Sequence, residues 1–183
     1  MAYASWSVVF GEQPSTAKWN ILGTNDASFA DGTGIANMAV NTTAISNPYK
    51  FSVYRNTTQS ISGYTKVLWN TEDYDTNNNF TGSTYTVPVT GFYAFTARVQ
   101  ITNAGGLQQV VMALLYKNGV SIRRGDETTA SGTSNIPVTS NLTAFVSLTA
   151  GDTIDLYCYT SGGLTLVAGS ENNYFMGYLI SQT

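Results

Sequence analysis

The carboxylates offer the widest choice of chemistry in this sequence. Glu72, Asp73 and Asp75 lie close together, and Asp126 is adjacent to Glu127. Two carboxyl groups on opposite sides of a cleft can hydrolyse a glycosidic bond, and oxygen-rich loops can bind calcium. Because neighbouring acids in turns are usually solvated, we expect no catalytic pair. Calcium at Glu72, Asp73 and Asp75 is the one cofactor that the sequence leaves open.

Other catalytic groups are missing from the sequence. The chain has no histidine, which excludes Ser-His-Asp nucleophilic sites and imidazole metal sites. Its single cysteine, Cys158, lies among apolar residues and is expected to be a buried, unreactive thiol. We therefore expect a protein that is not an enzyme, and a glycan depolymerase is the enzymatic alternative.

Tyrosines are candidates for ligand binding. Exposed tyrosine rings can stack on sugar rings while neighbouring Asn, Thr and Gln side chains donate hydrogen bonds. Tyr64, Tyr74 and Tyr85 are the candidates. The alternative is that these rings serve the core or an interface between subunits.

The charge pattern excludes two classes of partner. The net charge is −3, and the one basic pair, Arg123-Arg124, is followed at once by Asp126 and Glu127. Nucleic-acid binding requires clustered cations, so it is not expected. No apolar run approaches the roughly 20 residues of a membrane helix, and no signal peptide is visible at the start. We expect synthesis in the cytoplasm and no membrane insertion.

The spacing of apolar residues predicts strands. Residues 92–101 and 142–148 alternate between apolar and polar positions, as strands with one solvated face do. The Asn118-Gly119 pair is typical of a type I′ hairpin turn. Short strands separated by turn signals favour a jelly roll or sandwich.

Residues 110–116 and 174–180 are apolar on both faces of the predicted strands. Such strands need cover on the outside, either from a loop or from another subunit. Only 10% of the residues are charged, against roughly 25% in an average domain, which favours burial in an oligomer. The predicted interface residues are Met112, Leu114, Tyr116, Tyr157, Tyr159, Tyr174, Met176 and Tyr178.

Several blocks resemble one family in their order along the chain. They are residues 67–70, 85–95, 115–119, 148–156 and 173–179, with sequences VLWN, YTVPVTGFYAF, LYKNG, LTAGDTIDL and NYFMGYL. They resemble the globular heads of complement proteins, relatives of tumour necrosis factor. The resemblance implies a jelly roll of about ten antiparallel strands that assembles as a homotrimer. No collagen-like repeat precedes these blocks, and Trp69 stands where the family usually has Phe.

The first 47 residues differ from the rest, because short apolar bursts are interrupted by Gly, Pro and Asp. The stretch over residues 6–35 resembles a segment of bacteriophage tail-fibre and minor structural proteins, and the run KWNILGTNDASF carries the resemblance. We predict an adaptor over residues 1–47 and a jelly-roll domain over residues 48–183. The predicted virion-attachment residues are Trp6, Val8, Phe10, Trp19, Ile21 and Leu22.

These observations together predict a phage structural protein on the outside of the virion. The first hypothesis is a trimeric fibre or tip that attaches to a host surface glycan or protein. The second is a head fibre, capsid decoration or tail adaptor with a purely structural role. In both, other virion proteins bind the N-terminal segment.

Overall fold

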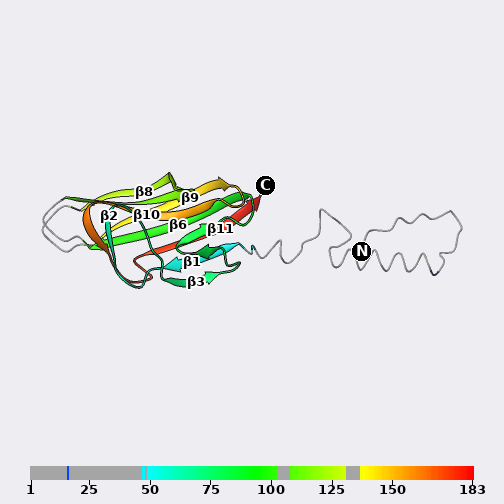
Figure 1. Cartoon of the computed structure of the whole chain (residues 1–183), viewed down its shortest axis with the longest axis horizontal. Coiled ribbons are helices and arrows are strands. Elements are labelled where there is room, and N and C mark those ends of the chain that lie inside the picture. The colour runs from blue at the N-terminus through cyan, green and yellow to red at the C-terminus, as the bar shows by residue number, and fades with distance from the viewer. Residues whose placement is uncertain (1–15, 17–46, 48, 103–107, 131–136) are drawn as a thin grey trace. The chain divides into compact units, whose positions relative to one another are not determined.

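Figure 1 shows a computed structural model of the chain. Antiparallel strands make up most of its described part. The structure describes Thr16, Asn47 and residues 49–102, 108–130 and 137–183. The chain divides into two units, Met1–Asn47 and Pro48–Thr183, and all of the described strands belong to the second unit. The predicted virion-attachment residues from Trp6 to Leu22 lie outside the described residues.

Five antiparallel strands make the first sheet, in the order β3-β1-β11-β6-β9. Their bounds are Lys50–Tyr54 for β1, Thr71–Asp75 for β3, Gly91–Thr102 for β6, Pro137–Leu148 for β9 and Tyr174–Gln182 for β11. The twelve-residue strands β6 and β9 pair along their whole length, from Gly91 opposite Leu148 to Thr102 opposite Pro137.

The second sheet is organised around β10 (Thr153–Leu166). Strands β2 (Gln59–Lys66) and β5 (Thr84–Thr86) pair with one side of β10, and β7 (Gln109–Lys117) pairs with the other. Strand β8 (Val120–Ala130) lies outside β7, and β4 (Phe80–Thr81) pairs with β5. The end of β10 pairs with β6, which joins the two sheets at one end of the sandwich.

The core between the sheets follows the predicted alternation. In β6 the inward residues are Tyr93, Phe95, Ala97, Val99 and Ile101, all at most 1% exposed. In β9 the inward residues are Leu142, Ala144, Val146 and Leu148. The predicted all-β jelly-roll sandwich is confirmed, and its core sits where period-two patterning places it.

Two tight turns have the same backbone geometry. Asn118 and Gly119 have φ of 50° and 80° and connect β7 to β8, which confirms the predicted type I′ hairpin. Gly82 and Ser83, with φ of 57° and 64°, connect β4 to β5 in the same way. This second hairpin was not predicted from the sequence, because serine is an uncommon residue at a left-handed position.

The aromatic core explains why Tyr85 is unavailable to a ligand. Its ring is 1% exposed and stacks on Phe51 with centroids 4.6 Å apart. Burial, followed by the proximity of Tyr93, raises the pKa of the Tyr85 hydroxyl. The prediction that Tyr85 binds sugar is therefore wrong, because its apolar ring completes the core.

Cys158 is buried, as expected, and burial raises the pKa of its thiol to about 12. Its side chain belongs to the core between the sheets. Within the described residues, no helix is long and apolar enough to cross a membrane.

Candidate functional site

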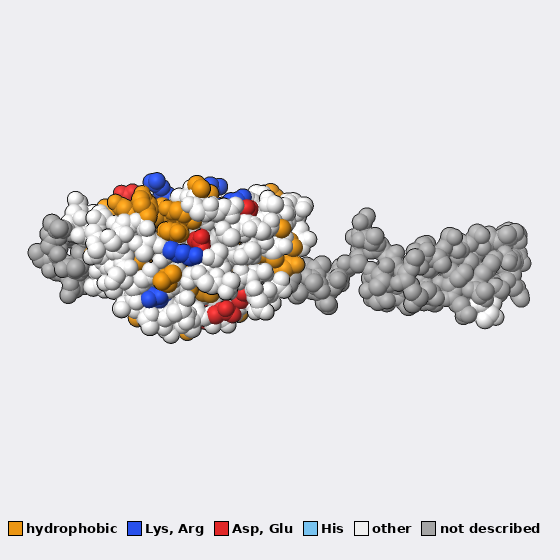
Figure 2. Space-filling view, viewed as in Figure 1, with side chains coloured by type: hydrophobic (Ala, Val, Ile, Leu, Met, Phe, Trp, Pro, Cys, Tyr) orange, Lys and Arg blue, Asp and Glu red, His pale blue; other side chains and the backbone are white. Residues whose placement is uncertain are grey.

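A cluster of tyrosines lies on the outer face of the second sheet. We call Tyr64 on β2, Tyr116 on β7, and Tyr157 and Tyr159 on β10 the tyrosine face. The rings of Tyr64 and Tyr159 have centroids 4.6 Å apart, and those of Tyr116 and Tyr157 stack at 4.0 Å. Figure 2 shows hydrophobic side chains gathered over this part of the sheet, near the positions of β2, β8 and β10.

Polar side chains border the tyrosine face. Lys66 Nζ lies 2.7 Å from Asp155 Oδ1, and Thr84 Oγ1 donates a hydrogen bond of 2.7 Å to the same carboxylate oxygen. By strand register, Lys66 is opposite Tyr157 and Asp155 is opposite Tyr116. Rings with apolar faces therefore lie beside charged and hydroxyl groups, a combination suited to binding sugars.

Met112 and Leu114 lie on the same face of β7 but are not exposed. Met112 is 5% and Leu114 0% exposed within the single chain. Their cross-strand neighbours on β10 are Tyr159 and Tyr157, with Glu127 opposite Met112 on β8. Because both side chains are buried within the single chain, the prediction that Met112 and Leu114 contact a second subunit is wrong.

The opposite face of the sandwich also carries exposed apolar side chains. We call Phe92, Phe145, Tyr178 and Ile180 the phenylalanine face; their exposed fractions are 48%, 65%, 50% and 49%. Phe145 and Tyr178 flank Ala94 of β6 in register. Phe92 and Phe145 also line a hollow of about 530 Å³.

The predicted interface residues therefore divide between two sheets. Tyr116, Tyr157 and Tyr159 belong to the tyrosine face. Tyr174, Met176 and Tyr178 alternate with buried residues on β11 and point outward on the side of the phenylalanine face, to which Tyr178 belongs. Because these are opposite faces of one sandwich, the residues do not form one continuous surface.

A β-bulge in β3 separates the three candidate metal ligands. Register shifts between Ser52 and Val53, so Glu72 pairs with Val53 on the inward side of β1. Asp73 instead accepts a hydrogen bond of 2.8 Å from Ser52 Oγ, and Asp75 accepts one of 2.7 Å from the backbone of Phe80. Among the described residues, no group of three or more acidic or sulfur ligands could hold a metal ion.

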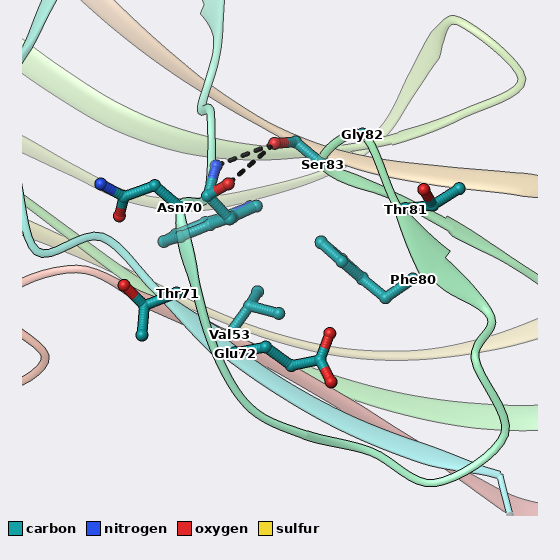
Figure 3. Close-up of a pocket in the computed structure, with 9 residues that line it drawn as sticks. Val53, Asn70, Thr71, Glu72, Phe80, Thr81, Gly82 and Ser83 are labelled. Atoms are coloured by element: carbon teal, nitrogen blue, oxygen red, sulfur yellow. Dashed lines mark hydrogen bonds between the residues drawn. The ribbon is translucent and has the colours of Figure 1, made fainter.

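Glu72 is directed into a pocket between β1, β3 and the β4–β5 hairpin (Figure 3). This aromatic pocket has a volume of about 300 Å³. In Figure 3 the side chains of Phe80 and Glu72 reach toward the hollow from opposite sides, and Val53 lies at its floor. The lining residues are Val53, Trp69, Asn70, Thr71, Glu72, Phe80, Thr81, Gly82 and Ser83.

The two aromatic walls of the pocket pack on aromatic residues of the core. The Trp69 ring stacks on Phe175 with centroids 6.1 Å apart, and the Phe80 ring stacks on Phe51 at 4.9 Å. The backbone N–H of Trp69 donates a hydrogen bond of 2.8 Å to the Ser83 hydroxyl in the hairpin turn. The pocket is thus shaped by the core and by the type I′ turn together.

The predicted sugar-binding tyrosines have different surroundings. Tyr64 is 54% exposed within the tyrosine face, and Tyr74 is 44% exposed on β3, opposite Ser52. Phe145 and Phe92 were not predicted from the sequence as surface features. The sequence did contain a signal for their exposure, because each is an apolar residue at an outward position of an alternating strand.

Comparisons with known proteins agree with this architecture. Residues 50–180 match the family model described as the C1q domain. The globular domain of zebrafish complement 1qA protein has a similar structure, with a TM-score of 0.54 and 20% identity, covering 74% of this chain and 99% of that one. Eiger TNF from S. frugiperda gives a TM-score of 0.60 at 12% identity, with 74% and 94% covered.

Murine APRIL is a third structural neighbour, with a TM-score of 0.52, 13% identity, and 72% and 98% of the two chains covered. At these identities the structures show the fold alone. None of the curated proteins compared with the chain matches it.

Proposed function

Since the chain belongs to the C1q domain family, we propose that it is a non-enzymatic homotrimer that serves attachment or display on the outside of a bacteriophage. The phage context is supported by residues 6–35, which resemble a segment of tail-fibre and minor structural proteins. The trimer is supported by the phenylalanine face. That face is the observation on which the proposal chiefly depends.

The phenylalanine face has the character of a subunit interface. Four large apolar side chains are about half exposed or more on the adjacent strands β6, β9 and β11. On the same side of β6, the Nε of Arg98 is buried without a hydrogen-bond partner. A second copy packed here would remove the apolar rings from water and could offer Arg98 an acceptor.

The mass of the protein in solution tests this assembly. We expect light scattering to give three chains for the wild type and a smaller species for Phe145→Ser. Val120→Ser is the matched control, because Val120 is 66% exposed on β8, outside the phenylalanine face. A wild-type protein that remains a single chain at micromolar concentration would contradict the trimer.

The tyrosine face is our candidate for attachment to a host glycan. A trimer would present three copies of it, so weak sites could act together through avidity. Loss of one stacking ring is expected to weaken each site by about two- to tenfold. We expect Tyr64→Ala to reduce binding of the trimer to host cells, and Val120→Ser, at an exposed position outside the tyrosine face, to leave it unchanged.

Location on the particle separates attachment from the structural alternative. Electron microscopy should place the protein at the tail or baseplate, and particles lacking it should adsorb poorly. A position on the capsid with normal adsorption after deletion would instead favour a head fibre or decoration protein. Release of sugars from host polysaccharide would contradict the non-enzymatic role.

A further inference from the structure

We propose that the aromatic pocket binds a small organic cation, an ammonium group that carries methyl or other alkyl substituents. The pocket combines two aromatic walls, Trp69 and Phe80, with the carboxylate of Glu72. No lysine or arginine is among its lining residues. The attraction of a cation to aromatic faces and to a nearby carboxylate is the chemistry that this combination supplies.

Neighbouring residues already hold the two aromatic rings in place, so a ligand could bind without rearranging them. Phe175 and Phe51 support the two rings from the core side, and Ser83 fixes the backbone of Trp69. A cation gains most when it sits within roughly 6 Å of a ring centroid. A volume of about 300 Å³ lies at the lower end for ligand sites, which suits a head group rather than an oligosaccharide.

Two polar residues of the lining, Asn70 and Ser83, are already engaged in hydrogen bonds within the chain. Asn70 donates from Nδ2 to Asn56 Oδ1 at 2.8 Å and to Thr57 Oγ1 at 2.9 Å, so both of its hydrogens are used. Ser83 is engaged with the backbone of Trp69. The donors left to a sugar include the Nε1–H of Trp69, which is buried without a hydrogen-bond partner, whereas an alkylated ammonium group needs no donor and gains from the aromatic rings and the carboxylate.

Glu72 is the one charged residue in the lining of the pocket. Its carboxylate forms no hydrogen bond or ion pair within the described part of the chain, and the residue is exposed. The bulge in β3 is the reason that Glu72 pairs with Val53 and lines the pocket while Asp73 binds Ser52. The carboxylate therefore supplies a negative charge at the pocket that no protein cation neutralises.

The chain offers a direct optical readout. Of its three tryptophans, Trp6 and Trp19 lie in the N-terminal segment, so a full-length Trp6→Phe, Trp19→Phe variant reports on Trp69 alone. We expect choline to change the fluorescence of Trp69 saturably, with a dissociation constant in the millimolar range. The neutral isostere 3,3-dimethyl-1-butanol should bind at least about tenfold more weakly, because it lacks the charge.

Substitution of the carboxylate supplies the second measurement. Glu72→Gln keeps the shape of the side chain and should weaken choline binding about fivefold, while Glu127→Gln on β8 should leave it unchanged. Both residues are exposed, so both variants should fold, which their unfolding temperatures will check. Equal binding of choline and its isostere, no effect of Glu72→Gln, or tighter binding of N-acetylglucosamine than of choline would each overturn the proposal. The result is independent of whether the phenylalanine face forms a trimer.

Discussion

Gly177 of β11 is the position at which one added methyl group should matter most. It lies in register with Phe51 on one side and Phe95 on the other. A Cβ at this position would lie 2.6 Å from Phe51 Cε1 and 2.6 Å from Phe95 Cδ1, where ordinary contacts are 3.4–4 Å. Both rings are at most 1% exposed, so neither can move aside without disturbing the core.

The expected cost of Gly177→Ala follows from this geometry. Forcing an extra carbon into a well-packed core costs about 1–3 kcal/mol. Alanine is favoured over glycine in a strand, which offsets this cost by about 0.5 kcal/mol or slightly more. We therefore expect a net loss of stability of about 0.5–2.5 kcal/mol, which lowers the unfolding temperature by roughly 2–10 °C for a domain of this size.

Urea unfolding followed by circular dichroism measures this difference, at one protein concentration because the stability of an oligomer depends on it. Gly163→Ala is the matched control: no atom lies within 4 Å of its added carbon, and its backbone is not left-handed. We expect that control to unfold at the wild-type midpoint or slightly above. If Gly177→Ala behaved in the same way, close packing of the two rings would not be the reason for glycine at this position.

Three further predictions concern single polar groups. Burial acts to raise the pKa of Asp152, but hydrogen bonds from Lys117 and from other groups outweigh it and hold the pKa below its usual value. Wild type should therefore be more stable to urea than Asp152→Asn. This difference in stability should be complete above the unfolded-state pKa of about 3.9 and shrink as pH falls below it. A difference that grows below pH 4 would contradict this. Ser140 accepts a hydrogen bond of 2.9 Å from the buried Ala113 N–H, so Ser140→Ala should cost about 1–3 kcal/mol by the same assay, and an unchanged midpoint would refute that role. The Cys158 thiol, with a pKa raised to about 12 by burial, should not react with a thiol reagent at pH 8 until urea unfolds the chain, and stoichiometric reaction in native buffer would show that it is accessible.

Local patterning was sufficient to predict the sandwich. The alternation in β6 and β9 and the Asn118-Gly119 turn depend only on near neighbours along the chain, so the inward residues and the hairpin could be predicted from sequence. The buried thiol of Cys158 followed from the same local reasoning. The blocks that resemble complement heads predicted the family, and the match of residues 50–180 to the C1q domain model confirms it.

Which exposed side chains lie together depended on the pairing of distant strands. Sequence could not show that Tyr174 and Tyr157 belong to opposite faces, because that depends on whether β11 and β10 enter the same sheet. It could not place Tyr85 in the core either, since both an exposed and a buried tyrosine fit a strand.

The aromatic pocket is a second feature that only the tertiary structure decided. Its carboxylate lines the pocket because a bulge in β3 changes the register at Ser52, and no pattern within residues 71–75 signals that extra residue. Its walls come from segments that are separated along the chain and meet only when the β4–β5 hairpin folds over β1. Periodicity along a strand determines which side chains face the core, whereas the register between strands determines which of them become neighbours.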